Sequence, residues 1–183
     1  MIRIILWLTG IAIIAYGTVQ IAARQIPNII MTRAIETLQQ GYDTGYNTFA
    51  HSGPITAQNQ RIVRPSPDLA YSICLYDVSD GAVAVTVPEA ANYLSVALYD
   101  MNTDNFFHLN DSEMTGNKTK IIILPPQKDH SPMAVPGYSA DRYIAAPTKT
   151  GLVLVRRVLM DEQDWPVIEE ERRQMTCETV TPG

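Results

Sequence analysis

The chain has 183 residues, of which 46% are hydrophobic and 18% are charged, and its formal net charge is −5. This length and composition suit one globular domain with its own core, because disordered chains have fewer apolar residues and a larger net charge. The acidic balance argues against a nucleic-acid-binding function, since phosphate binding requires a basic face. No run of Lys or Arg predicts an electrostatic contact with anionic lipid either.

The chain begins with an uncharged apolar segment, Ile4 to Ala23, between Arg3 and Arg24. A helix of that length spans roughly 30 Å, the thickness of a hydrocarbon core. A cleaved signal peptide has a shorter apolar region and a small-x-small cleavage site, for which Ile21-Ala22-Ala23 is a poor match. We therefore predict that residues 1–25 are a single-pass transmembrane anchor in contact with membrane lipid, with cleavage as the alternative.

The orientation of this anchor follows from the basic residues around it. The amino terminus and Arg3 favour a cytoplasmic start, although Arg24 and Arg33 follow closely on the other side. We expect the anchor to lie in a bacterial inner membrane with the remaining chain in the periplasm. Gly10 and Gly17 share a helix face and allow close helix packing, although two tolerated glycines are the simpler interpretation.

Residues 26–59 are predicted to form an amphipathic connector helix and an irregular lead-in. Pro27 should end or bend the first helix, and Asn28 should cap a second one that stops at Gly41. One face of this second helix is apolar and is expected to pack on the domain or on the membrane surface; it carries Ile30, Met31, Ala34, Ile35 and Leu38.

Residues 60–183 are predicted to form a mainly β domain. Short runs of β-branched and aromatic residues alternate with Pro, Gly and Asp turns, and they cover 61–64, 70–78, 82–87, 92–100, 106–109, 120–124, 142–146 and 151–159. The spacing favours an antiparallel β-sandwich or a jelly-roll-like barrel. The second and third runs should form a hairpin around Ser79-Asp80-Gly81. Residues 167–175 should form a short C-terminal helix with Pro166 in its first turn.

Several motifs occur in a recognisable order between Arg64 and Phe106: Pro65, Asp68, Tyr71 and Ser72; Val87 and Pro88; Tyr93, Val96, Leu98 and Asp100; Thr103 and Phe106. This segment resembles the bacterial family called domain of unknown function 1254, and residues 151–165 are similar to its arginine-bearing strand and acidic helix. The chain departs from the family pattern at Pro67 and Leu69, where Asn and Thr are usual.

The resemblance implies a β-sandwich fold over roughly residues 60 to 175. Many members of the family continue into a second domain of unknown function, 1214, which this chain lacks. The resemblance therefore also implies that a separate protein partner supplies the companion domain. It brings no catalytic residues.

Asp68 follows two prolines and precedes a strand, so it is either a turn cap or a polar group at the mouth of an aromatic cleft. The candidate residues of this ligand cleft are Asp68, Tyr71, Tyr93, Tyr99, Asp100 and Phe106.

Cys74 and Cys177 are the two cysteines of the chain. In the periplasm they could form a disulfide that ties the C-terminal tail to a core strand. Closing a loop of about 100 residues stabilises a fold by roughly 4.7 kcal/mol in the chain-entropy model. The alternative is that Cys74 is a small buried apolar residue.

Other patterns give weak evidence for a site. Asp100, Asn102 and Asp104 imitate a calcium loop, but Asn105 replaces the required glycine, so a solvated turn is the better interpretation. The histidines, His51, His108 and His130, are scattered, and we predict no metal and no cofactor.

No catalytic residue is predicted. Ser72, His108 and Asp100 could be drawn as a triad, but no Gly-x-Ser-x-Gly elbow surrounds Ser72. We expect a non-enzymatic periplasmic accessory or binding module of unknown ligand that acts with a companion protein. The alternative is an enzyme or receptor for a glycan, lipid or small molecule at the aromatic cleft.

Overall fold

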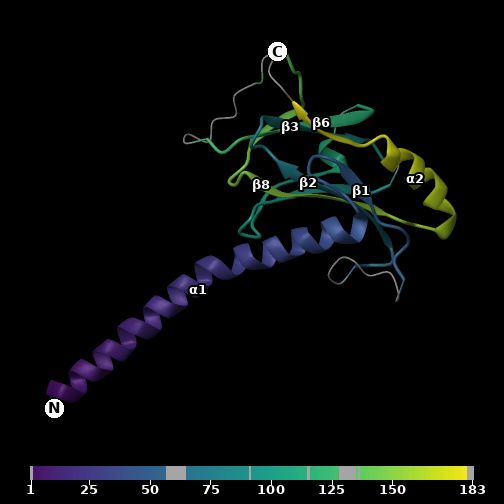
Figure 1. The fold of residues 1–183 in the computed structure, drawn as a ribbon. Helices are drawn as coiled ribbons and strands as arrows, with labels where there is room; N and C mark the ends of the chain where they lie inside the picture. Colours follow the sequence, from purple (N-terminus) through teal and green to yellow (C-terminus); the bar gives the residue numbers. More distant parts are fainter. Residues whose placement is uncertain are drawn as a thin grey trace.

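The computed structural model describes residues 2–56, 65–90, 92–114, 116–127, 135 and 137–180. A long N-terminal helix, α1 (Ile2–Tyr42), leads into a mainly β domain built from two sheets (Figure 1). The five-stranded sheet contains, in spatial order, β1 (Phe49–His51), β2 (Leu69–Asp77), β8 (Thr150–Val158), β4 (Leu94–Tyr99) and β5 (Asn105–Asn110). The four-stranded sheet contains β7 (Arg142–Ala145), β6 (Lys118–Leu124), β3 (Ala82–Pro88) and β9 (Thr176–Val180).

The two sheets share one apolar core. Leu94, Val96 and Leu98 of β4 point into it together with residues of β3, β6 and β8, so the strand predicted at 92–100 contributes every second residue to the core. The pairing between named strands is antiparallel except between β6 and β7, which run parallel. The strand predicted at 61–64 lies outside the described residues.

The predicted hairpin between 70–78 and 82–87 is wrong, because these runs belong to different sheets. β2 pairs with β1 and β8, whereas β3 pairs with β6 and β9. The turn at 79–81 therefore carries the chain from one sheet to the other. The residues from Ala70 to Tyr76 are all buried, since the core covers one face of β2 and α1 covers the other. A strand buried on both faces reveals little about its neighbours from its pattern.

One continuous helix replaces the two that were predicted before residue 42, so the described residues contain two α-helices and not three. α1 passes through Pro27, and Asn28 lies inside the helix, where its carbonyl accepts a hydrogen bond from the Thr32 hydroxyl at 2.8 Å. A proline inside a helix removes one hydrogen bond and bends the axis, and Figure 1 shows α1 curving part-way along its length. The helix persists because its second half is packed against the sheet.

The two halves of α1 have different surroundings. Met31, Ile35 and Leu38 are buried against Ile73 and Leu75 of β2, which confirms the prediction that the connector packs on the domain. Ile30, predicted on the same face, is instead 56% exposed. In the first half, an 18-residue window with a mean hydropathy of 1.9 has no buried residue. Among the described residues α1 is the one helix long and apolar enough to cross a membrane, and a signal sequence shares these features.

The C-terminal region closes the domain. The predicted helix begins two residues early as α2 (Trp165–Arg173), with Pro166 in its first turn, and the strand that follows it, β9, was not predicted. Two single turns of 3-10 helix complete the fold, η1 (Asp111–Glu113) and η2 (Glu162–Asp164).

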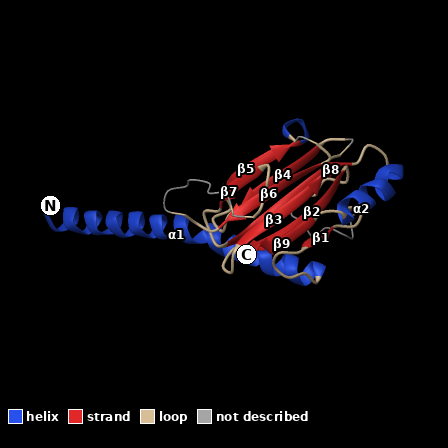
Figure 2. Ribbon diagram, turned by 90° about the horizontal axis from the view of Figure 1, so that it is seen from above, coloured by secondary structure: helices blue, strands red, loops and turns tan. Residues whose placement is uncertain are grey.

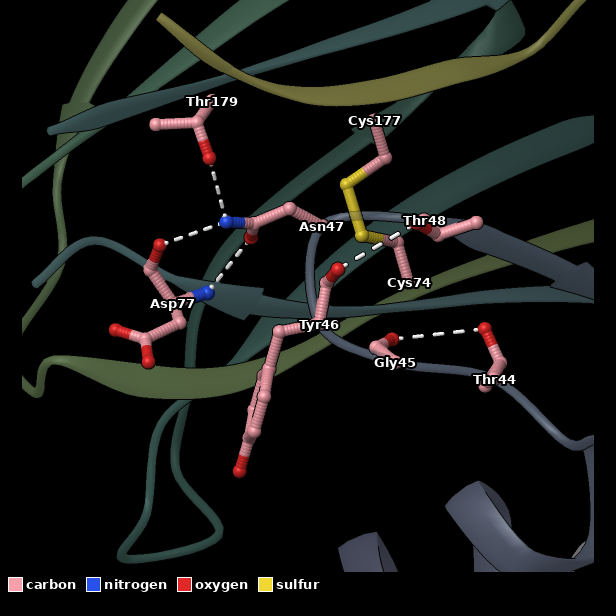
Figure 3. The surroundings of a disulfide bond; sticks show 9 residues. All are labelled: Thr44, Gly45, Tyr46, Asn47, Thr48, Cys74, Asp77, Cys177 and Thr179. Atoms are coloured by element: carbon pink, nitrogen blue, oxygen red, sulfur yellow. Dashed lines mark hydrogen bonds between the residues drawn. A yellow bond between two sulfur atoms is a disulfide. The ribbon is translucent and has the colours of Figure 1, made fainter. Parts of the chain in front are cut away.

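A disulfide joins the two sheets. Cys74 of β2 is bonded to Cys177 of β9, with Cα atoms 6.5 Å apart (Figure 3). Beside it, the Asn47 side-chain amide donates to the Asp77 carbonyl at 3.0 Å and to the Thr179 hydroxyl at 2.8 Å. The lead-in predicted to be irregular is therefore part of the fold, because Asn47 bridges the sheets and β1 forms a sheet edge.

Candidate functional site

The candidate site lies where α2 covers one end of the space between the sheets. α2 and the amino terminus of α1 lie at opposite ends of the molecule in both views (Figures 1 and 2). Ile168 and Arg172 face inward and are 4% and 1% exposed. We call this end of the domain the distal end.

Arg172 holds α2 on the five-stranded sheet. Its guanidinium donates to the carbonyl oxygens of Ser52 at 3.0 Å and Tyr71 at 3.1 Å, and it forms an ion pair with Glu169. It also lies over the Trp165 ring, 4.8 Å from the ring centroid, an arrangement that stabilises a cation. Although burial raises the pKa of Glu169, the hydrogen bond and positive charge of Arg172 lower it, and the net shift is downward. These contacts make the orientation of Trp165 a fixed property of the fold.

A second buried arginine, Arg157 of β8, supports the same helix from inside. Arg157 is 3% exposed and forms an ion pair with Glu171 of α2. Burial lowers the pKa of Arg157, and the Glu171 carboxylate opposes that shift. Beside this pair is a hollow of about 120 Å³, whose apolar lining includes Val158 and Val167. The volume is below the roughly 300–1,000 Å³ of small-molecule pockets.

His51 and Ser72 form a part-buried hydrogen-bonded pair, with Nδ1 and Oγ 2.8 Å apart. Burial lowers the pKa of His51 to about 4, and the positive charge of Arg172 adds to that shift, so the imidazole is neutral at pH 7. Ser72 is 1% exposed, and neither residue lines the hollows at this end. The pair is therefore a contact between two adjacent strands, in which the serine is buried and the histidine is half-buried.

A wide groove of about 550 Å³ lies beside Trp165 on the outer side of the distal end. Three chain segments form it, and its lining consists of Pro54, Ile55, Thr56, Pro67, Asp68, Leu159, Met160, Asp161 and Trp165. Most of these residues are exposed, and Met160 is 73% exposed. The groove therefore combines an apolar floor with two carboxylates, those of Asp68 and Asp161, and one indole ring. We call it the distal groove.

The structure separates the predicted cleft residues. Asp68 lines the distal groove, and its carbonyl accepts a hydrogen bond from the Leu159 amide at 2.9 Å. Tyr71 lies below and is 5% exposed, and its hydroxyl accepts a hydrogen bond from the Ser66 amide at 2.8 Å. Tyr93 is 50% exposed, next to the start of β4. None of the other aromatic residues predicted for the cleft lines this groove with Asp68.

Tyr99 and Phe106 lie on opposite faces of the five-stranded sheet. Tyr99 packs in the cluster beneath α1, whereas Phe106 packs in the core against Tyr76, with ring centroids 6.4 Å apart. Residues two apart on a strand share a face, but Tyr99 and Phe106 are on different strands joined by a turn, and a register shift follows Leu98. The six predicted residues therefore do not form one cleft.

Asp100 is 3% exposed and closes the turn between β4 and β5. Its carboxylate accepts hydrogen bonds from the backbone amides of Asn102 at 2.8 Å and Asp104 at 3.0 Å. Thr103 in this turn has a φ of 68°, a left-handed conformation. The carboxylate is thus occupied by its own turn, as the turn interpretation of this segment predicts.

Within the described residues, the histidines do not converge on one site, and Ser72 and His108 of the possible triad do not lie within hydrogen-bonding distance. His51 and His108 lie on β1 and β5, the two edges of the five-stranded sheet, about 19 Å apart at ordinary strand spacing. Ser72 on β2 is separated from His108 by β8 and β4, which places them about 14 Å apart. His130 lies outside the described residues.

Three important residues of the distal end, Trp165, Arg157 and Arg172, were not singled out in the sequence. An arginine beside another arginine and acidic residues is typical of a solvated helix face. The sequence of α2 therefore predicts an exposed Arg172, whereas the structure buries it. The signal that could have indicated it is the spacing of Ile168 and Arg172, four residues apart on one helix face.

Comparison with known proteins assigns the family. The model of the family "Protein of unknown function (DUF1254)" matches residues 46–179. The chain belongs to the DUF1254 family. No curated protein matches this DUF1254 chain.

Two solved structures resemble this DUF1254 chain. The first is the VPA0106 protein from Vibrio parahaemolyticus, with a TM-score of 0.62 and 15% identity over 86% of this chain and 37% of that protein. The second is an uncharacterized protein from Burkholderia cenocepacia, with a TM-score of 0.49 and 14% identity over 76% of this chain and 36% of that one. The first likeness extends to the fold alone, and the chain spans little more than a third of either protein.

Proposed function

We propose that this chain is a membrane-anchored accessory or binding module of the bacterial periplasm, with a domain of the β-sandwich type, that acts with a companion protein. The observation that carries this proposal is the division of α1 into two halves. The 18-residue apolar window has no buried residue, whereas Met31, Ile35 and Leu38 are packed on the sheet. A bare apolar helix joined rigidly to a folded domain suits one half in lipid and the other in water.

Two further observations support the compartment and the partner. The Cys74–Cys177 bond suits an oxidising compartment such as the periplasm. The similar protein from Vibrio parahaemolyticus is much longer, since the likeness covers 37% of it. A domain of this fold is therefore part of a larger protein in that case, which supports the proposal that this domain acts beside a companion protein.

The anchor is tested by fractionating cells that produce the full chain at native level. We expect the protein to stay in the membrane pellet after washing with alkaline carbonate, and its amino-terminal sequence to begin upstream of Ile4. Release into the soluble fraction with a mature terminus near Arg24 would contradict the anchor.

The companion is tested by mild detergent extraction of native membranes followed by affinity purification. We expect one protein to copurify in a fixed ratio and to exchange slowly during size-exclusion chromatography. The matched control keeps residues 1–42 but replaces the β domain with an unrelated soluble domain. Recovery of the same protein with this control would show that the helix alone captures it, and a monomer would contradict the companion.

The distal groove also supports a second candidate function, a receptor or enzyme for a glycan, lipid or small molecule. Its volume of about 550 Å³ lies within the range of small-molecule sites. Native mass spectrometry of the purified chain would detect a bound molecule, and Asp68→Ala should reduce its occupancy. Unchanged occupancy in Asp68→Ala would remove this candidate.

A further inference from the structure

The distal end carries an unusual share of the exposed apolar side chains of the β domain. Among described residues beyond α1, the large apolar side chains with high exposure are Tyr46, Tyr93, Tyr138, Met160 and Val167. Three of these lie at the distal end, and Met160 and Val167 are 73% and 61% exposed. Tyr93 is held beside them, because its carbonyl accepts a hydrogen bond from the Val158 amide at 3.0 Å.

Negative charge surrounds these apolar residues. Asp68 and Asp161 line the distal groove, and Asp164 lines the neighbouring hollow. Within the described part of the chain, no Lys or Arg forms an ion pair with these three carboxylates.

Among the described residues, the arginines of α2 and Arg157, which pairs with α2, do not offset this charge at the surface. Arg157 and Arg172 are buried and paired with glutamates of α2. Arg173 is exposed but lies 3.7 Å from the carboxylate of Glu170. These three described arginines are thus paired within the fold. Asp68 and Asp161 are exposed and Asp164 lines a hollow, while the Asp161 carboxylate also accepts a hydrogen bond from the Gln163 amide at 2.9 Å and the Asp164 carboxylate accepts one from the Asp161 amide at 3.2 Å.

We propose that the distal groove, with the exposed apolar residues beside it, docks a basic and apolar polypeptide segment of the companion protein. This inference rests on the proposed function and specifies the surface and the chemistry of the partner. Lysine or arginine side chains of the segment pair with Asp68 and Asp161, and an apolar side chain packs on Met160 and Trp165. Trp165 is held ready for this contact because Arg172 stacks on its ring.

A polypeptide fits the groove better than a small molecule or a bilayer does. Small-molecule sites bury most of their ligand, whereas most residues of this groove are exposed, as on a surface that a chain can lie across. A membrane is disfavoured because the distal end lies opposite the apolar half of α1 (Figures 1 and 2). An acidic surface would also be repelled by anionic lipid.

The docking can be measured through the fluorescence of Trp165. The chain has two tryptophans, so Trp7→Phe in the full chain, held in a nonionic detergent, leaves Trp165 as the one indole reporter. The probes are two synthetic pentapeptides with the same two leucines and central glycine, one carrying two lysines and the other two glutamates. We expect the lysine peptide to change the emission of Trp165 saturably and the glutamate peptide to leave it unchanged.

Charge variants supply the control. The double variant Asp68→Asn, Asp161→Asn should bind the lysine peptide with an affinity roughly three- to tenfold lower than the wild-type chain, which is the loss expected for two exposed ion pairs. Asp80→Asn with Glu178→Gln removes the same charge from exposed positions outside the groove and should change the affinity less than twofold. Equal response to both peptides, no response to either, or equal loss in both double variants would overturn the proposal.

The result separates this inference from the proposed function. If a companion copurifies equally with the wild-type chain and with the Asp68→Asn, Asp161→Asn variant, the companion stands and the distal groove is not its docking site. If the lysine peptide binds through Asp68 and Asp161 but no companion copurifies, the proposed function falls while the basic-segment site stands.

Discussion

The disulfide gives the most quantitative test of how this fold is stabilised and where it forms. Cys74 and Cys177 are 103 residues apart, and closing a loop of that size stabilises a fold by about 4.7 kcal/mol in the chain-entropy model. Measured values are usually 2–4 kcal/mol. We therefore expect Cys74→Ala with Cys177→Ala to lower the free energy of unfolding by about 2–5 kcal/mol, a large part of the stability of a domain of this size.

The assay has two readouts on the full chain in detergent. Urea unfolding followed by Trp165 emission in a Trp7→Phe background gives the free energy, and wild-type protein treated with reductant should match the double variant. Thiol trapping in intact cells reports the compartment, because a periplasmic domain should resist labelling until it is reduced. Free thiols in cells, or a double variant within 0.5 kcal/mol of the oxidised protein, would refute the reasoning.

Three further predictions concern single positions. Gly151→Ala should destabilise the domain by at least about 2 kcal/mol, because its Cβ would lie 2.3 Å from the Tyr99 carbonyl oxygen; a change in urea midpoint corresponding to less than 0.5 kcal/mol would contradict this. Since burial lowers the pKa of His51 from 6.5 to about 4, the unfolded chain binds a proton that the native chain does not. The contribution of His51 to the free energy of unfolding is therefore fully present above pH 6.5, and it falls by roughly 1–2 kcal/mol as the pH drops to 4, after allowance for partial exposure. His51→Gln should reduce the dependence of the free energy of unfolding on pH between 6.5 and 4. An unchanged dependence in this variant would contradict the prediction. Ile35→Ala should lower the free energy of unfolding by about 2 kcal/mol and expose the second half of α1 to protease. The control Ile30→Ala changes a position that is 56% exposed and should do neither. Equal cleavage of both variants would show that the Ile35 contact does not hold α1 on the sheet.

The parts of the fold that depend on local pattern could be predicted from the sequence. The apolar run of α1, the packing face with Met31, Ile35 and Leu38, and the alternation of β4 all follow from helix and strand periods. The family could also be assigned, because its motifs occur in the right order along the chain.

The parts that depend on long-range contacts could not be predicted. A turn at 79–81 predicts a reversal of the chain. Pairing with strands distant in sequence, β8 for β2 and β6 and β9 for β3, places the two strands in different sheets. Pro27 predicts the end of a helix from local chemistry, and the contacts of Met31 and Ile35 with β2 offset that preference. The prediction of one aromatic cleft was wrong for a similar reason, because Tyr99 and Phe106 are close in sequence but pack in different hydrophobic clusters.

The continuity of α1 determines how the distal groove is presented. From Arg24 to Tyr42 the helix rises roughly 28 Å at 1.5 Å per residue, and its later turns pack on the sheet through Met31, Ile35 and Leu38. α2, whose first residue Trp165 lines the groove, lies at the opposite end of the molecule from the amino terminus of α1 (Figure 1). With the proposed anchor in lipid, a partner bound at the groove would lie away from the bilayer. This position favours a folded companion over a lipid head group as the occupant, because a basic segment would then meet Asp68 and Asp161 without competition from an anionic membrane surface.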